Sequence, residues 1–125
     1  MLFLRKPGSY RKPSHEQRAL SLLDPEEHRS WFRSVWADIR GETRKRGHPA
    51  PFPVELAYRL IKMFSFVGDT VLDPFWGTGS TTLATIRAAR SSVGYDVEQR
   101  YLDIGRDRLA QLDAVIPARV EFPNL

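Results

Sequence analysis

Cysteine is absent from this 125-residue sequence, which excludes a disulfide framework and any zinc site built on cysteine. No run of about 18 apolar residues occurs, so no membrane-spanning helix is expected. The apolar start covers only residues 1–4 and has no small-residue cleavage site, so we expect no signal peptide. The three histidines, His15, His28 and His48, are too dispersed to predict a metal site. These absences predict a cytoplasmic chain that needs neither a metal nor a membrane.

Two common ligand-binding and catalytic motifs are also missing. No Gly-Lys-Ser or Gly-Lys-Thr follows the glycines near residue 77, which excludes a phosphate-binding P-loop. No serine stands in a Gly-x-Ser-x-Gly turn, which excludes the nucleophile elbow of many hydrolases. The glycine-rich stretch that is present must therefore serve another purpose.

Positive charge is concentrated in the first part of the chain. Residues 1–50 hold eleven Lys/Arg against six Asp/Glu, whereas residues 51–125 hold eight against nine, within a total of +4. A basic segment beside a nearly neutral unit favours a polyanionic partner such as DNA, and a solvated basic surface is the alternative. The length of 125 residues and the hydrophobic content of 42% suffice for one small domain.

Helix and strand patterns alternate from residue 53 onward. Two earlier helices are predicted by capping signals at Ser14 and Asp24, and the second has an apolar face that includes Trp31, Val35 and Trp36. The predicted elements are helices over 15–23, 25–38, 53–64, 82–90 and 97–113, strands over 2–4, 70–72 and 92–95, and a strand or disordered tail at 120–122.

This alternation predicts an α/β fold with a parallel, doubly wound sheet, preceded by a small helical segment. Only two parallel strands are evident, whereas a sheet of this kind commonly has about five or more because both of its faces are buried. We therefore expect an incomplete, partial Rossmann-like fold.

The stretch from residue 71 to residue 82 combines a short strand, an acid, a glycine turn and the start of a helix. Gly77 and Gly79 let bare backbone approach a ligand, and the helix start offers free N–H groups. Asp73 stands at the strand end, before the glycines. An acid there suits a ligand with a positive group, such as the amino or sulfonium end of S-adenosylmethionine.

A second acid, Asp96, follows Asp73 by 23 residues, close to the spacing of about 20 at which a second-strand acid meets a ribose. Both acids are expected at the carboxyl ends of adjacent strands, where Asp96 would accept hydrogen bonds from ribose hydroxyls. Thr81 or Thr82 is expected to cap the following helix or to bond a ligand carboxylate. The alternative is a structural turn flanked by two solvated acids.

Three segments resemble consecutive motifs of the amino-directed DNA methyltransferases, which methylate adenine N6 or cytosine N4 with S-adenosylmethionine. They are residues 48–53 (His-Pro-Ala-Pro-Phe-Pro), 73–82 (Asp-Pro-Phe-Trp-Gly-Thr-Gly-Ser-Thr-Thr) and 94–96 (Gly-Tyr-Asp). The order, with the His-Pro segment ahead of the glycine motif, resembles the circularly permuted β-class. Residues 2–8 also resemble the strand that closes the catalytic half in that class.

The resemblance implies a Rossmann-like methyltransferase fold, S-adenosylmethionine as the cofactor, DNA as the substrate and a role in restriction-modification. It also implies a set of cofactor-binding residues. These are the methionine-side residues Asp73, Phe75, Gly77, Thr78, Gly79 and Thr81, the ribose and adenine residues Asp96 and Val97, and the residues His48, Ala50 and Phe52 on the other side of the pocket. The family more often has Glu where this chain has Asp96, and the shorter Asp must lie closer to the ribose diol.

The family's catalytic motif, Asp/Asn/Ser-Pro-Pro followed by an aromatic residue, is missing, because no Pro-Pro occurs in this sequence. In the family its first residue binds the target amino group and its aromatic stacks on the flipped base. Residues 73–76 (Asp-Pro-Phe-Trp) look similar, but they run directly into Gly-Thr-Gly and are assigned to the cofactor turn. We therefore predict no catalytic residue in this chain.

The resemblance thus implies the carboxyl-terminal, cofactor-binding half of a β-class enzyme, which is inactive without an amino-terminal half that carries the catalytic motif. Residues 48–113 would bind the cofactor, and residues 114–125 would form a tail. Residues 1–47 would form a basic segment in which Arg44, Lys45 and Arg46 contact DNA or form a solvated loop.

Two other functions stay open. One is a non-catalytic remnant or DNA-associated module that binds S-adenosylmethionine without turnover. The other, a nicotinamide-dependent dehydrogenase, is disfavoured by the acid before the turn and by the lack of a third glycine. The DNA target, the choice between adenine and cytosine and the oligomeric state do not follow from the sequence.

Overall fold

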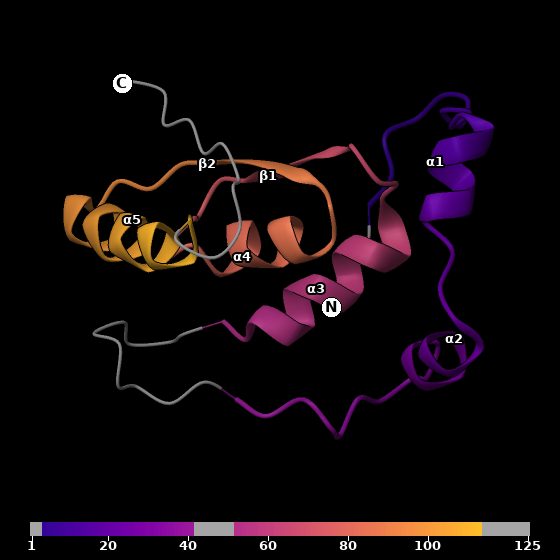
Figure 1. Cartoon of the computed structure of the whole chain (residues 1–125), viewed down its shortest axis with the longest axis horizontal. Coiled ribbons are helices and arrows are strands. Elements are labelled where there is room, and N and C mark those ends of the chain that lie inside the picture. The colour runs from indigo at the N-terminus through magenta and orange to yellow at the C-terminus, as the bar shows by residue number, and fades with distance from the viewer. Residues whose placement is uncertain (1–3, 42–51, 114–125) are drawn as a thin grey trace.

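The computed structural model describes residues 4–41 and 52–113. Figure 1 shows α1 and α2 at one end of the molecule and α5 at the opposite end. The elements in chain order are α1 (His15–Leu20), α2 (Pro25–Trp31), α3 (Val54–Phe64), β1 (Thr70–Asp73), α4 (Ser80–Arg87), β2 (Ser91–Gly94) and α5 (Gln99–Asp113).

The two strands form a parallel sheet. Its register pairs Thr70 with Ser91 and Asp73 with Gly94, so both strands end at the same edge of the sheet. α4 is the crossover between them, as the alternating pattern predicted. The sheet has two strands among the described residues. The expected partial Rossmann-like fold is therefore confirmed.

The first part of the core lies between α3 and α4. Ala84 of α4 and Ala88, the residue after α4, pack against Ala57 and Ile61 of α3, and Val71 of β1 packs on the same cluster. Ala84 is completely buried. The small side chains let the two helices approach closely.

The second part of the core lies between α4 and α5. Leu83 of α4, Leu109 of α5 and Trp76 of the glycine turn form one buried cluster, with Leu102 and Leu112 packed against it. α4 is therefore covered by apolar contacts toward both neighbouring helices, and it supports the turn that precedes it.

The capping signals of the first two helices are confirmed. Ser14 accepts a hydrogen bond from the N–H of Gln17, whose side chain accepts one from the Ser14 backbone in return. Asp24 and Glu27 form the same reciprocal arrangement at the start of α2. α1 ends at Leu20, slightly before the expected residue 23. Local bonds between side chains and backbone thus determine where both helices begin.

The buried Arg59 attaches the segment after α2 to α3. Its guanidinium donates to Asp38 at 2.5 Å and to Glu55 at 2.9 Å. The same group lies 5.7 Å from the ring centre of Trp31 and 5.6 Å from that of Trp36. The Arg59 hydrogen bond lowers the pKa of Asp38, and the Asp38 carboxylate raises the pKa of Arg59.

The expected helix over 25–38 is wrong beyond residue 31. α2 ends at Trp31, and Val35, predicted to be buried, is 75% exposed. In a continued helix the carbonyl of Trp31 would accept the N–H of Val35, but it accepts the indole N–H of Trp36 at 2.8 Å instead. The chain leaves the helix here because Trp31 and Trp36 then both reach the guanidinium of Arg59.

Two smaller expectations concern residues near the start and the end of the chain. Of the strand expected at 2–4, only Leu4 is described, and it is exposed and lies outside any strand. Residues 120–122 lie outside the described residues. The remaining helices and strands agree with the predicted ranges to within a few residues.

Arg90 closes the connection between α4 and β2. The side chain is buried, and it donates to the carbonyl of Ala88 and, at 2.8 Å, to that of Ser65. Burial lowers the pKa of this guanidinium. Arg90 thus satisfies backbone carbonyls where α3 and α4 end next to the sheet.

Candidate functional site

The turn after β1 begins with Asp73. Its carboxylate accepts a hydrogen bond from the N–H of Phe75 at 3.0 Å, which bends the chain away from the sheet. Gly77 and Gly79 then adopt left-handed conformations, with φ of 54° and 78°. Glycine adopts these angles without a steric penalty, so the expected role of both glycines in bending the turn fits the backbone.

Asp96 lies beside this turn, as the spacing predicted. One carboxylate oxygen accepts the N–H of Gly77 at 2.7 Å, and the other accepts the N–H of Glu98 at 2.9 Å. The N–H of Trp76 donates to the carbonyl of Tyr95 at 2.9 Å. The ends of the two strands are therefore connected by hydrogen bonds at the edge where open α/β sheets bind their ligands.

Trp76 holds the turn in place. The sequence did not predict this role, because Trp76 stood there only as one residue of the motif. Its indole is 5% exposed, and its N–H donates to the hydroxyl of Thr82 at 2.8 Å. A Cβ added at Gly94 would lie 2.0 Å from the indole, one at Gly105 2.5 Å and one at Gly79 3.0 Å. Three glycines from separate segments thus leave the space that the indole fills.

The same packing explains the glycine at position 105, inside α5. A signal for it was present in the sequence, since glycine inside a helix weakens the helix and needs a reason. The partner could not be identified, because Trp76 lies 29 positions away in the sequence.

The two threonines at the start of α4 differ in their surroundings. Thr82 is buried and bonds both Trp76 and, at 2.8 Å, the hydroxyl of Ser92, so its role is to hold the turn on the sheet. The helix is preceded by Gly79, and no side chain caps it. The expectation that a threonine caps α4 is therefore wrong, and Thr81 stays the candidate for a ligand carboxylate.

Arg108 of α5 supports the other side of the turn. Its guanidinium donates to the carbonyl of Thr78 at 3.3 Å and to the hydroxyl of Ser80 at 3.1 Å. Thr78 and Ser80 are both buried. No sequence pattern indicated this contact, which joins residues 28 and 30 positions apart.

Large apolar side chains are exposed around the two acids. Phe75 is 87% exposed and Val97 is 98% exposed, directly beyond Asp73 and Asp96. Phe52 is 45% exposed. Exposed apolar side chains that closely follow the two acids, as Phe75 and Val97 do, are typical of a site that a ligand covers.

Some predicted site residues lie outside the described part of the chain. These are the pocket residues His48 and Ala50 and the possible DNA contacts Arg44, Lys45 and Arg46. The described residues contain no cluster of side chains suited to a metal ion, and none of their helices is long and apolar enough to cross a membrane.

Comparison with known protein families gives a match over most of the chain. The model of the N6/N4 methyltransferases, described as DNA methylase, matches residues 1–107. The chain belongs to this DNA methylase family. The resemblance noted in the three motifs is thereby confirmed.

Relatives of this DNA methylase chain are substantially longer. It is 40% identical over 118 residues to the type II methyltransferase M.MthZI of Methanothermobacter thermautotrophicus, covering 87% of this chain and 33% of the relative. It is 41% identical over 127 residues to M.MjaI of Methanocaldococcus jannaschii, covering 95% of this chain and 41% of the relative. The chain thus spans between a third and a half of the length of these relatives.

Solved structures agree with the fold. The chain matches TTHA0409 of Thermus thermophilus, a DNA modification methylase by name that was crystallised with S-adenosyl-L-methionine. The TM-score is 0.76 and the identity 50%, over 86% of this chain and 41% of that one. The solved complex of M1.HpyAVI with SAM matches 54% of the chain with a TM-score of 0.51 and 32% identity.

Proposed function

We propose that this chain is the cofactor-binding part of an S-adenosylmethionine-dependent DNA methyltransferase that acts on adenine N6 or cytosine N4. The proposal rests mainly on the hydrogen bond of 2.7 Å that the N–H of Gly77 donates to Asp96, because it connects the glycine turn to the end of the neighbouring strand. The similarity to a methylase crystallised with S-adenosyl-L-methionine supports the choice of cofactor.

Each strand end would hold one part of the cofactor. Asp96 has lone pairs beyond those used by Gly77 and Glu98, and these would accept bonds from the ribose hydroxyls. Asp73 would balance the positive end of the methionine part. Val97 and Phe75, which are exposed, would cover the adenine and the methionine chain.

The helix start would bind the opposite charge. α4 has no side-chain cap, so its first N–H groups would be available to the cofactor carboxylate together with Thr81. Gly77, Thr78 and Gly79 would keep the backbone close to the ligand. Phe52, with His48 and Ala50 outside the described residues, would close the far side of the pocket.

The cofactor supplies a methyl group from its sulfonium to the exocyclic amine of a flipped base. This chain would orient the sulfonium and exclude water around it. The group that receives the amine proton and presents the base would come from a part of the enzyme that this sequence does not contain, because no Pro-Pro motif occurs in it.

We also propose a division of the chain along these lines. Residues 48–113 would form the cofactor-binding part and 114–125 a tail. Residues 1–47 would form a basic segment that faces DNA, with Arg44, Lys45 and Arg46 on phosphates. The excess of positive charge in residues 1–50, eleven Lys/Arg against six Asp/Glu, supports this placement.

Isothermal titration calorimetry tests the cofactor site. We expect S-adenosylmethionine and its demethylated product to bind the wild-type chain. Asp96→Ala should weaken binding by about 10- to 100-fold, because charge-assisted hydrogen bonds are lost. Asp73→Ala should also weaken it, through the lost opposite charge.

Glu16→Ala is the matched control, since this exposed carboxylate lies on α1, at the opposite end of the molecule from α5 (Figure 1). Melting curves without ligand show whether each variant is folded. Folded variants of Asp73 and Asp96 that bind like the wild type would refute the residue assignment. If the folded wild-type chain binds only a nicotinamide dinucleotide, S-adenosylmethionine is not its cofactor.

A second candidate is a non-catalytic module that binds S-adenosylmethionine, which the missing Pro-Pro motif favours. A DNA methylation assay separates the two, run with this chain alone and after mixing with a polypeptide that carries the motif. Methylation only on mixing supports part of a split enzyme, and binding without methylation in either case supports the module. Methylation by the chain alone would show that catalysis does not need the missing motif.

A further inference from the structure

α5 packs directly against the glycine turn. A Cβ added at Gly105 would lie 3.2 Å from the backbone carbonyl carbon of Thr78, in addition to its contacts with the Trp76 indole. Four residues further along α5, Leu109 is buried in the same apolar cluster as Trp76. The distance between this helix and the turn is therefore fixed by packing, because buried side chains leave little room for movement.

Arg108 extends from the same part of α5 to the turn. Its Nη1 atom donates hydrogen bonds to the carbonyl of Thr78 at 3.3 Å and to the hydroxyl of Ser80 at 3.1 Å. Both of these residues are buried. A buried acceptor that loses its donor lowers stability, so removal of the guanidinium favours any change that gives the Thr78 carbonyl another partner.

Two hydrogen bonds determine how the peptide group between Thr78 and Gly79 lies. Its carbonyl faces Arg108, and its N–H donates to the carbonyl of Trp76 at 3.0 Å. The glycines on either side of Thr78, at positions 77 and 79, have φ of 54° and 78°. Because glycine has no Cβ, it accepts many backbone angles, and the peptide can rotate when its bonds are lost. Arg108 therefore selects one of the orientations that the two glycines allow.

The orientation of this peptide affects the charge at the start of α4. The helix begins directly after Gly79 without a side-chain cap, and its first N–H groups are the proposed partners of the cofactor carboxylate. A rotated peptide would point the Thr78 carbonyl away from α5, toward the face of the turn on which the cofactor would lie. The partial negative charge of that oxygen would then repel the carboxylate.

We propose that Arg108 is a positioning residue for the carboxylate of S-adenosylmethionine, because it binds the turn from α5 and keeps the Thr78 carbonyl out of the cofactor pocket. The inference rests on the proposed function, in which the glycine turn and the start of α4 bind this cofactor. Arg108 itself would not touch the ligand. Its removal should therefore affect the carboxylate contact and leave the proposed contacts of Asp96 and Val97 with the ribose and the adenine unchanged.

Calorimetry with two ligands tests the proposal. Decarboxylated S-adenosylmethionine keeps the adenosine, the sulfonium and the amine of the cofactor and lacks only the carboxylate. We expect Arg108→Met to bind S-adenosylmethionine about tenfold more weakly than the wild type does, which corresponds to the loss of one favourable interaction with a charged group. Both proteins should bind the decarboxylated compound equally. Arg108→Lys should recover much of the loss, because one nitrogen makes both bonds and an ammonium has three donors.

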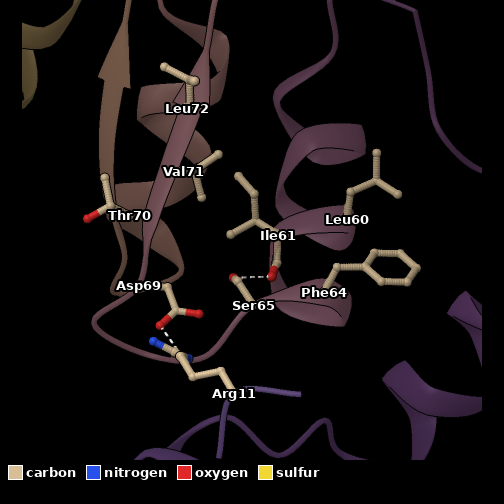
Figure 2. A pocket seen from close by; sticks show the side chains of 9 residues that line it. All are labelled: Arg11, Leu60, Ile61, Phe64, Ser65, Asp69, Thr70, Val71 and Leu72. Atoms are coloured by element: carbon tan, nitrogen blue, oxygen red, sulfur yellow. Dashed lines mark hydrogen bonds and ion pairs between the residues drawn. The ribbon is translucent and has the colours of Figure 1, made fainter. Parts of the chain in front are cut away.

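Arg11→Met is the matched control for these titrations. Arg11 also attaches a segment of the chain to the sheet, through a hydrogen bond to Asp69. Figure 2 shows this contact directly ahead of β1, whereas Asp73 and the glycine turn lie at the other end of the strand. The variant removes the same kind of side chain far from the turn, so it should bind both ligands as the wild type does.

Hydrogen exchange of the Gly79 amide is a measurement that needs no ligand. If the peptide rotates in Arg108→Met, this amide leaves the carbonyl of Trp76 and should exchange at least about tenfold faster than in the wild type. The amide of Ala88, which donates to the carbonyl of Ala84 at 3.0 Å near the other end of α4, is the internal control and should stay protected. Melting curves show whether each variant is folded, and Arg108→Gln takes the place of Arg108→Met if the latter is unfolded.

Several results would overturn the proposal. An equal loss of affinity for both ligands would show that Arg108 only maintains the fold. Unchanged binding of S-adenosylmethionine, or unchanged exchange of the Gly79 amide, would show that the peptide keeps its orientation without the guanidinium. A wild-type chain that does not bind S-adenosylmethionine refutes the proposed function instead, so the two failures are distinguishable.

Discussion

Trp76 shows how one side chain determines the shape of the candidate site. Trp76 is buried below the turn. Its indole N–H donates to the hydroxyl of Thr82, and its backbone N–H donates to the carbonyl of Tyr95. The next residue, Gly77, donates to Asp96. Positioning of the proposed ribose-binding acid therefore depends on a residue that would not touch the cofactor.

The packing of Trp76 against Gly105 predicts a measurable coupling. Gly105→Ala should improve helix propensity by about 1 kcal/mol. We nevertheless expect it to lower the free energy of unfolding by about 1–3 kcal/mol, because the new methyl group would lie 2.5 Å from the indole. In a Trp76→Leu background, itself destabilised by about 3 kcal/mol, the same change should cost much less.

Urea denaturation of the wild type, Gly105→Ala, Trp76→Leu and the double variant measures this coupling. Gly41→Ala is the control, since no atom lies within 4 Å of a Cβ at that position. If Gly105→Ala lowers the free energy of unfolding equally in both backgrounds, the indole is not the reason why position 105 excludes a methyl group.

At the scale of elements, Arg59 decides how the segment after α2 lies on α3. The guanidinium connects Asp38 and Glu55 and lies near the rings of Trp31 and Trp36. A second contact, between Lys62 and Glu27 at 2.5 Å, joins α3 to α2 itself. The attachment is therefore ionic and aromatic rather than a continuous apolar core.

Arg59→Met should lower the free energy of unfolding by about 2 kcal/mol, because two ion pairs and the contacts with both indoles are lost. The thioether side chain keeps part of the buried volume, so the loss reflects mainly the charge. Arg18→Met, at an exposed position of α1, is the matched control and should change stability by less than about 0.5 kcal/mol. Equal effects in urea denaturation would contradict the role of Arg59.

The Asp38–Arg59 pair also predicts a pH dependence. The folded-state pKa of Asp38 is lowered from its ordinary 3.8 by the Arg59 hydrogen bond. A lowered pKa means that the stabilisation is present above about pH 4 and is lost as the pH falls through the folded-state value. The stability difference between wild type and Asp38→Asn should therefore shrink as the pH falls below about 4.

Denaturation at a series of pH values measures that difference. Glu16→Gln, at an exposed position of α1, controls for the general effect of removing a carboxylate. A difference that grows on acidification would have the wrong sign for this ion pair.

At the scale of the whole molecule, cofactor binding should stabilise the fold. A ligand present at about 100 times its dissociation constant adds about 2.7 kcal/mol. For a domain of this size that corresponds to a rise in Tm of about 10 °C. S-adenosylmethionine should produce this shift in the wild type and a much smaller one in Asp96→Ala at the same concentration.

A nicotinamide dinucleotide serves as the control ligand in the same thermal assay. It should leave the Tm of the wild type unchanged. An equal shift with both compounds would indicate a nucleotide site without the specificity proposed for Asp73.

The elements from residue 53 onward were predictable because their signals are local. Apolar periodicity, the short strands and the glycine turn each depend on neighbouring residues, and a standard crossover between the strands brings Asp96 to the glycine turn. The likeness to a known family added the proposed identity of the ligand.

The parts that were missed depend on contacts between distant residues. α2 ends at Trp31 because Trp36 bonds its carbonyl and Arg59 lies near both rings. Thr82 bonds Trp76 and Ser92 instead of capping α4. Periodicity and capping rules describe one element at a time, so they contain no information about such partners.

The burial of Trp76 also gives the protein an optical probe of its own. The indole of Trp76 lies in an apolar cluster and donates to a hydroxyl, whereas Trp36 is half-exposed. The two residues therefore fluoresce from different environments. Because the turn's own backbone holds this indole in place, loosening of the turn changes its fluorescence even when no methyl group is transferred. Tryptophan fluorescence can thus show whether the turn of the candidate site is held in place, in the free chain as well as in a complex.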